Sequence, residues 1–249
     1  MPKKAVIFDV DGTAMRMGDD FGTPSERLKS AVATLKTTHH ISTATGRNLY
    51  YAKHVIEFLE LTDPCIIAAG TEIYDPIKKE IIWREPIPVA TYGHIAEALR
   101  DNQDPAFSGE QNVDGTVGAT VSTLLNEDVA VIYVIGVDAL EATELTNKLE
   151  HPDLHIINMH AFSDEVKRDI HIHSVKASKE HAVTELLRIM DVSKEDSTVI
   201  GDGLNDLHLF VAGGTKVAMG NAVPELKAAA DIVIKSIDED GLAQYLETL

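Results

Sequence analysis

The feature that most constrains the fold of this chain is a short apolar run that ends abruptly in acidic residues. Residues Ala5 to Phe8 are all apolar, and they are followed at once by Asp9-Val10-Asp11-Gly12-Thr13. A run this short and this apolar is typical of a strand in a parallel sheet, where both faces of the strand are covered. We therefore predict a buried parallel strand that ends in a polar turn.

Strands and helices alternate over the next 80 residues. The pattern predicts strands at His40 to Ala44 and Cys65 to Ala69, separated by a helix over Tyr50 to Leu61. An earlier helix, ending near Lys36, begins at the capping box Thr23-Pro24-Ser25-Glu26, with proline at the first helical position. Ile73-Tyr74-Asp75-Pro76, followed by Ile81-Ile82-Trp83, indicates a short hairpin. This alternation predicts a doubly wound, Rossmann-like parallel sheet.

The pattern changes near Arg84 and returns after His173. Between them the sequence predicts an inserted α+β domain with an antiparallel sheet. Its expected helices are 90–100 and 139–149, and its expected strands are 116–124, 129–137, 154–159 and 168–173. The α/β alternation then resumes with a helix over 178–190 and strands at 197–200, 216–219 and 231–234. We expect one core domain from residues 1–83 and 174–249, and an inserted domain from residues 84–173.

The composition limits the classes of partner. The net charge is −18, so nucleic acid and anionic membrane surfaces are not expected to bind. The single cysteine, Cys65, allows no disulfide within the chain, and the sequence shows neither a signal peptide nor a run of membrane-spanning length. We expect a cytoplasmic protein, a monomer or small homo-oligomer, that binds a small molecule.

Asp9 and Asp11 are the first candidate site residues. Two residues apart on an extended segment, they point to the same side and repel each other unless a cation lies between them. Gly12 allows a sharp turn and leaves backbone N–H groups for a phosphate. The alternative is an Asp-rich turn with no ligand.

A second acidic cluster follows the strand at 197–200. Its sequence is Gly201-Asp202-Gly203-Leu204-Asn205-Asp206, which supplies two carboxylates and an amide, the oxygen ligands that Mg²⁺ prefers. Acidic residues also favour the N-terminus of a helix without binding anything.

The remaining candidates are cationic or hydroxyl groups. Thr45-Gly46-Arg47 ends a predicted strand and offers a hydroxyl, an amide and a guanidinium to an anion. Lys179 lies in the first turn of a helix, where its charge opposes the helix dipole unless an anion is near. Taken alone, a plain strand-to-helix turn and a solvated lysine are the stronger interpretations. Ligands bind at the carboxyl ends of strands in such sheets, so all four clusters are expected on one rim.

In this order the four clusters resemble the motifs of the haloacid dehalogenase (HAD) superfamily of phosphatases. Asp9 to Thr13 is similar to the DxDGT motif, Thr45 to the Thr/Ser motif, Lys179 to the lysine motif, and Gly201 to Asp206 to the GDxxND motif. Thr45-Gly46-Arg47, the run Val217 to Ala222, and Ala230-Asp231 followed by Asp240-Gly241 resemble the Cof-type branch, which carries a type C2 cap between the second and third motifs. The run Gly70-Thr71-Glu72-Ile73 departs from the Asn-Gly pair usual there and resembles sucrose-phosphatase-like members.

The resemblance implies a role for each motif residue. Asp9 would be the nucleophile that forms an aspartyl-phosphate, and Asp11 the general acid and base. Thr45 and Lys179 would hold the phosphoryl oxygens. Mg²⁺ would bind the carboxylates of Asp9 and Asp202 and the backbone carbonyl of Asp11, with Asp206 in support. The expected phosphate- and substrate-binding residues are Gly12, Gly46, Arg47 and Asn205.

These roles predict a Mg²⁺-dependent phosphatase for a small metabolite, with a sugar phosphate implied by the resemblance. A phosphomutase of the phosphomannomutase kind is the alternative, since such enzymes share the fold and the DxDGT motif. A non-catalytic regulator would be expected to lack a motif residue. The insert should close over the site and contribute specificity. It contains His171 and His173, which alternate on a predicted strand and are better explained as plain strand residues than as metal ligands.

Overall fold

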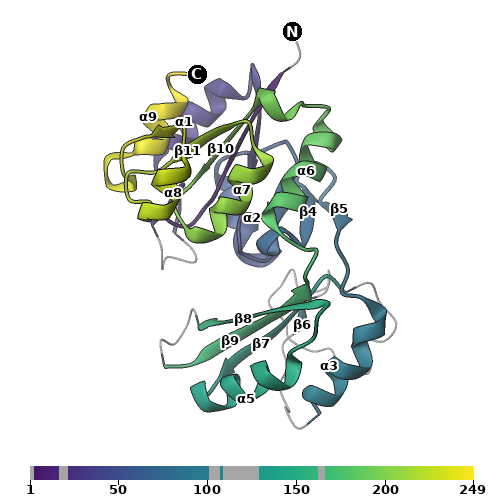
Figure 1. Cartoon of the computed structure of the whole chain (residues 1–249). Coiled ribbons are helices and arrows are strands. Elements are labelled where there is room, and N and C mark those ends of the chain that lie inside the picture. The colour runs from purple at the N-terminus through teal and green to yellow at the C-terminus, as the bar shows by residue number, and fades with distance from the viewer. Residues whose placement is uncertain (1–2, 17–21, 101–106, 109–128, 162–165) are drawn as a thin grey trace. The chain divides into compact units, whose positions relative to one another are not determined.

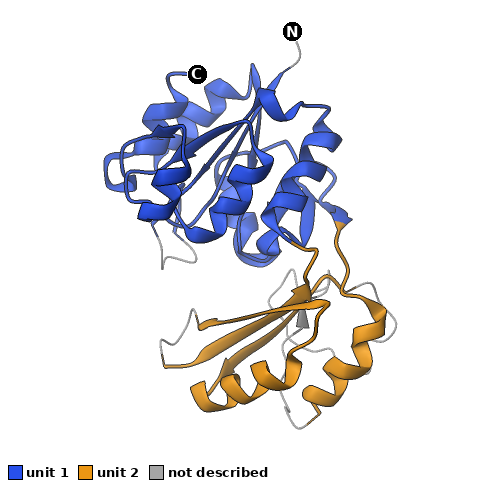
Figure 2. Ribbon diagram, viewed as in Figure 1, with its two compact units in different colours: residues 1–83, 178–249 blue, residues 84–177 orange. Residues whose placement is uncertain are grey.

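The computed structural model describes residues 3–16, 22–100, 107–108, 129–161 and 166–249. The chain forms two compact units (Figure 2). The first combines Met1–Trp83 with Ser178–Leu249, and the second is Arg84–Ala177. The second unit ends at Ala177, whereas the sequence pattern predicts its end at His173.

The first unit contains a five-stranded sheet in which every pairing is parallel. Its order is β12 (Ile232–Val233), β11 (Thr215–Ala218), β10 (Ser197–Gly201), β1 (Lys4–Phe8) and β2 (His39–Thr43) (Figure 1). The apolar run of the N-terminus is therefore a central strand, buried from Ala5 to Phe8. The predicted doubly wound α/β core is confirmed.

Strand register places the ends of the central strands side by side. Phe8 is paired with Ile200 on β10 and with Thr43 on β2. The next residues extend the alignment, since Asp9 donates its N–H to the Ile200 carbonyl at 2.9 Å and Ala44 donates to the Phe8 carbonyl at 2.9 Å. The polar segments that follow β1, β2 and β10 thus start at the same edge of the sheet.

Helices connect the strands of the first unit. The α-helices are α1 (Glu26–Leu35), α2 (Leu49–Phe58), α6 (Lys179–Met190), α7 (Leu207–Ala212), α8 (Pro224–Ala229) and α9 (Gly241–Leu246). Short 3₁₀ turns occur at η1 (Ala68–Gly70), η3 (Lys194–Asp196), η4 (Leu204–Asp206) and η5 (Ile237–Glu239). Helix α1 packs on α9, and α6 packs on α7. The predicted start of α1 at Thr23 is wrong by two residues, because the Ser25 hydroxyl accepts the N–H of Leu28 at 3.1 Å and caps the helix instead.

The third predicted strand is shorter than expected. β3 (Cys65–Ile67) pairs antiparallel with β4 (Glu72–Asp75), and β5 (Glu80–Arg84) completes a three-stranded sheet that contains the predicted hairpin. One bridge, between Ala44 and Ile66, joins β3 to the parallel sheet. The strand ends because Ala68, Ala69 and Gly70 all have positive φ angles, which turn the chain away from the extended conformation.

The second unit has the predicted α+β composition. Its sheet has the order β6 (Phe107–Ser108), β7 (Val131–Val137), β9 (Arg168–Ser174), β8 (Leu154–His160), and every pairing is antiparallel. Among the described residues, its helical elements are η2 (Val89–Thr91), α3 (Tyr92–Ala98) and α5 (Ala139–Leu149), and α3 and α5 lie along one face of the sheet (Figure 1). Alternate strand residues such as Ile132, Ile170 and Ile172 pack under them. The predicted strand over 116–124 lies outside the described residues.

Within the described ranges, no helix has both the length and the apolar character needed to cross a membrane.

Candidate active site

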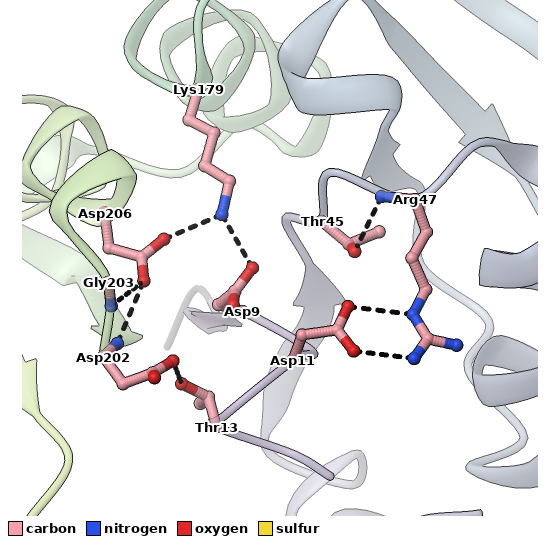
Figure 3. A network of polar contacts seen from close by, with 9 residues as sticks. All are labelled: Asp9, Asp11, Thr13, Thr45, Arg47, Lys179, Asp202, Gly203 and Asp206. Atoms are coloured by element: carbon pink, nitrogen blue, oxygen red, sulfur yellow. Dashed lines mark hydrogen bonds and ion pairs between the residues drawn. The ribbon is translucent and has the colours of Figure 1, made fainter. Parts of the chain in front are cut away.

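Three carboxylates meet at the carboxyl edge of the parallel sheet (Figure 3). Asp9 follows β1, Asp202 follows β10, and Asp206 ends the short η4 turn. Each contributes one oxygen to a cluster in which these atoms lie within 4.8 Å of one another. Asp9 and Asp206 are buried and Asp202 is partly exposed. The strand register described above brings Asp9 and Asp202 together, although the sequence separates them widely.

Lys179 supplies the positive charge of this cluster. Its Nζ donates to Asp9 Oδ1 and to Asp206 Oδ1, each at 2.7 Å, and the side chain is 3% exposed. The interpretation of Lys179 as a solvated lysine is therefore wrong. Ser178 caps α6 by accepting the N–H of His181, which fixes Lys179 as the first helical residue.

A close approach of η1 to the start of α6 fixes the backbone of Lys179. Gly70 has a φ of +94°, and a Cβ at this position would lie 2.5 Å from the carbonyl carbon of Ser178 and 2.6 Å from the Lys179 nitrogen. Glycine is required for both the backbone conformation and the approach. The run Gly70 to Ile73, which carries the sequence departure noted above, thus supports the lysine.

The charges of the cluster do not balance without a further cation. Three carboxylates and one ammonium would leave a charge of −2. Burial, together with the charge of Asp206, raises the pKa of Asp9 to about 8 despite Lys179. Burial also raises the pKa of Asp202 to about 6. For Lys179, burial lowers the pKa, but the charges of Asp9 and Asp206 outweigh it and the net shift is upward.

Asp202 and Asp206 are held by hydrogen bonds from the surrounding loop. Asp206 Oδ2 accepts the N–H groups of Asp202 at 2.9 Å and of Gly203 at 3.0 Å. Asp202 Oδ1 accepts the hydroxyl of Thr13 at 2.9 Å. Thr13 was not among the site residues predicted from the sequence, although its place directly after Gly12 in the acidic turn is the feature that could have identified it.

Asp11 lies apart from the cluster and is paired with Arg47. The guanidinium donates from Nε to Asp11 Oδ2 at 2.9 Å and from Nη2 to Oδ1 at 2.6 Å (Figure 3). The side chain of Arg47 is 3% exposed and that of Asp11 is 24% exposed. The two carboxylates of the Asp9-Val10-Asp11 turn therefore have different cationic partners, Lys179 and Arg47.

Thr45, Gly46 and Asn205 lie around these charged groups. The buried hydroxyl of Thr45 accepts the N–H of Arg47 at 3.1 Å. Gly46 has open space beside it, since a Cβ there would meet nothing within 4 Å. Asn205 is exposed and lies next to Gly203. A Cβ added to Gly203 would lie 2.4 Å from Oδ1 of Asn205.

The histidines of the second unit form ring contacts. His173 packs edge-on against His155 with ring centroids 4.8 Å apart, and His171 packs against Tyr133 at 4.6 Å. Burial lowers the pKa of both His171 and His173 to about 4, so both are neutral near pH 7. Among the described residues, neither histidine belongs to a group of three or more possible metal ligands.

Comparison with known proteins gives the family. The sequence profile of the haloacid dehalogenase-like hydrolases matches residues 6–118 and 107–246. The chain belongs to this family. It is 27% identical to a putative phosphatase, YkrA, of Bacillus subtilis, over 100% of this chain and 98% of that one. It is 25% identical to the pyridoxal phosphate phosphatase YbhA of Escherichia coli, over 99% and 98% of the two chains.

Solved structures share the fold over the whole chain. TM0651 from Thermotoga maritima has a TM-score of 0.80 at 24% identity, covering 99% of this chain and 97% of that one. The subclass IIB sugar phosphatase BT4131 has a TM-score of 0.72 at 22% identity, covering 99% and 98%. With the family established and its relatives named as phosphatases, the chain is a phosphoric monoester hydrolase, as its sequence predicts.

Proposed function

We propose that this enzyme hydrolyses the phosphate monoester of a small metabolite through an aspartyl-phosphate on Asp9, with Mg²⁺ as cofactor. The observation that carries the proposal is the arrangement around Asp9. Among the described residues, buried Lys179 is the hydrogen-bond donor to its carboxylate, and it bonds Oδ1 only. Asp9 Oδ2 is then available to attack an electrophile, while Lys179 lies within reach of an anion bound beside it.

The proposed reaction has two displacements at phosphorus. Asp9 attacks the phosphorus, the bond to the ester oxygen breaks, and Asp11 protonates that oxygen as it leaves. A water that gives its proton to Asp11 then attacks the same phosphorus, so that inorganic phosphate leaves and the Asp9 carboxylate is restored. Thr45, Lys179 and the N–H groups near Gly12 and Gly46 would hold the phosphoryl oxygens.

The acidic cluster fits a divalent cation. Its donor atoms are carboxylate oxygens, it would carry a charge of −2 with all three carboxylates ionised, and the raised pKa values of Asp9 and Asp202 reflect the cost of ionising them without a cation. We assign the ligands as the carboxylates of Asp9 and Asp202 and the backbone carbonyl of Asp11, with Asp206 supporting them. When bound there, Mg²⁺ would lower the pKa of Asp9 and offset repulsion between its carboxylate and the substrate.

Asp11 must change partners during this cycle. In the structure both of its oxygens accept bonds from Arg47, which keeps the carboxylate away from Asp9. To exchange a proton with the leaving oxygen, Asp11 has to release at least one of these bonds. Arg47 would then be able to donate to the substrate, the role that its place beside Thr45 predicts.

The proposed substrate class is sugar phosphates. The support is the resemblance of the motifs and the fold shared with a subclass IIB sugar phosphatase. The pyridoxal phosphate phosphatase among the relatives also acts on a small phosphorylated molecule. Asn205, exposed beside the acidic cluster, is assigned to substrate binding.

The proposal is tested by phosphate release from a panel of phosphorylated metabolites, with Mg²⁺ and with EDTA. We expect release that requires Mg²⁺ and that falls at least about 10³-fold in Asp9→Asn. The matched control is Asp191→Asn, an exposed aspartate whose left-handed backbone asparagine also tolerates. Full activity in Asp9→Asn would refute the nucleophile. Conversion of sugar-phosphate isomers that needs a bisphosphate and releases little phosphate would replace hydrolysis by mutase activity.

A further inference from the structure

Asn221 lies at the edge of the acidic site although it belongs to none of the four motif clusters. It is in the loop after β11, and the backbone of this loop is bonded to the strand end that carries Asp202. Met219 donates its N–H to the Gly201 carbonyl at 3.0 Å, and Val223 donates to the Asp202 carbonyl at 2.9 Å. These bonds fix the backbone of Asn221 next to Asp202.

The carboxamide of Asn221 contacts two other segments. Its Nδ2 donates to the carbonyl of Gly12 at 2.8 Å and lies 3.5 Å from Asp202 Oδ2. Its Oδ1 accepts the N–H of Ile237, at the start of η5, at 2.9 Å. The exposed side chain of Asn221 therefore connects the Asp9–Thr13 turn, the acidic loop 201–206 and η5.

The hydrogen bond from Asn221 to Gly12 lies where the Asp9–Thr13 turn packs very closely against Asp202. Gly12 has a φ of +84°, and a Cβ there would lie 2.1 Å from Asp202 Oδ2. Asp202 Oδ1 accepts the hydroxyl of Thr13, and Asn221 holds the carbonyl of the peptide that precedes Thr13. A shift of this peptide would move the hydroxyl that orients Asp202.

We propose that Asn221 is a positioning residue, which holds the Asp9–Thr13 turn against Asp202 and so preorganises the cation site. The proposal rests on the proposed function only in taking the acidic cluster as the cation site. Residues that orient metal ligands in this way typically contribute 10–100-fold to metal affinity or activity.

Tethering of η5 is the competing role for Asn221, and other contacts already provide it. Gly220 donates its N–H to the Lys235 carbonyl at 3.2 Å, and a Cβ at Gly220 would lie 2.6 Å from the Ser236 nitrogen. The loop after β11 is thus joined to the η5 segment without the side chain of Asn221. The bond to Gly12 is the contribution that this backbone pairing does not supply.

Mg²⁺ binding to the purified full-length protein, measured by calorimetry, separates the two roles. We expect Asn221→Ala to raise the Kd for Mg²⁺ at least about tenfold. Ile237→Pro removes the N–H that bonds Asn221 Oδ1 at a first helical position, which proline tolerates, and should leave the Kd within about twofold. Asn158→Ala, which removes an asparagine that bonds Thr146 in the second unit, is the matched control.

Two results would overturn the proposal. One is a Kd within twofold of wild type in a folded Asn221→Ala protein. The other is an equal loss of affinity in Asn221→Ala and Ile237→Pro, which would make Asn221 a tether for η5. Thermal unfolding in EDTA shows whether each variant is folded.

Hydrogen exchange in EDTA provides a second readout that needs neither cation nor substrate. Asn221→Asp keeps an acceptor for Ile237 but cannot donate to the Gly12 carbonyl. Exchange of the amides in residues 9–16 should accelerate in this variant, and unchanged exchange contradicts the proposal even if Asn221→Ala does not fold. Failure of the proposed function is distinguishable, since the wild-type enzyme would then neither bind Mg²⁺ nor release phosphate.

Discussion

The two cations of the site are held in different ways. Lys179 is bonded to two buried carboxylates, and its backbone is fixed by the close approach of Gly70. Arg47 is equally buried, but its partner Asp11 is 24% exposed, and Gly46 beside it has free space. A charge bonded to buried partners on all sides cannot move without a large cost, whereas a pair that opens to water can separate. We therefore expect Lys179 and its partners to stay fixed, and Arg47 and Asp11 to rearrange. We call these two groups the Lys179 half and the Arg47 half of the site.

Removal of the fixed ammonium should have the largest effect. Lys179→Met leaves Asp9 and Asp206 buried without their cation, which is expected to lower the free energy of unfolding by about 3–5 kcal/mol. Phosphate release should fall by at least about 10³-fold, because Lys179 is proposed to hold the phosphoryl oxygens. Chemical denaturation and the phosphate assay measure both effects. Lys176→Met, at an exposed lysine just before α6, is the control. Similar losses in both variants would contradict the special role of Lys179.

Substitution by alanine should change stability very differently at Gly70, beside Lys179, and at Gly46, beside Arg47. Gly70→Ala combines an unfavourable φ with a clash against backbone atoms of Ser178 and Lys179, so a loss of about 2–4 kcal/mol is expected. Gly46→Ala meets no atom within 4 Å and should change stability by less than about 0.5 kcal/mol. Denaturant titration of the two variants side by side is the measurement. Equal losses would show that the halves do not differ in packing.

Replacement of Arg47 should cost less stability than replacement of Lys179. Arg47→Met leaves Asp11 able to reach water, so about 1–2 kcal/mol of stability should be lost. Activity should fall about 10–100-fold, because Asp11 loses its partner and Arg47 is proposed to donate to the substrate. Arg47→Lys, which keeps the charge but not the two parallel bonds, should lie between Met and wild type. A loss of stability as large as in Lys179→Met would remove the distinction between the two halves.

The last expected effect is a pH dependence of stability that comes from the Lys179 half. The folded-state pKa of Asp9, about 8, lies above its ordinary value of 3.8, so the folded protein binds more protons than the unfolded one between these values. Without metal, stability should therefore fall as pH rises from about 5 to 8, by at most about 1.4 kcal/mol per pH unit for this group. Thermal unfolding in EDTA measures the slope, which Asp9→Asn should flatten. An unchanged slope in that variant would assign it to other groups.

The sequence predicted which residues lie at the carboxyl edge of the sheet better than it predicted the contacts between their side chains. Strand ends can be located from apolar runs, and parallel strands bring their carboxyl ends together, so the meeting of Asp9 with Asp202 followed from pattern alone. The partners of Lys179 and Arg47 depend on how far side chains reach between distant segments. Asn221 shows the same limit. It lies in the run Val217 to Ala222, which resembles the Cof-type branch, but its contacts with Gly12 and Ile237 cannot be read from that local pattern.

Within the fold, predictions failed where two local preferences competed. At the start of α1, both Thr23 and Ser25 are good caps, and the structure uses the second. At β3, an apolar run that suggested five strand residues yields three, because the positive φ angles from Ala68 to Gly70 bring η1 against α6. This turn is specified by contact with a helix more than 100 residues later, which a local pattern does not contain.

The pairing of β1 with β10 has a consequence for how the protein folds during synthesis. The hydrogen bond from Thr13 to Asp202 joins residues 189 positions apart, and the second unit is a continuous segment that lies wholly between them. Contacts of such separation form slowly and come late on a ribosome, which releases the N-terminal end first. The inserted unit can therefore become compact while β1 still lacks one of its neighbours, and enzymatic competence arises only when the final third of the polypeptide has been made.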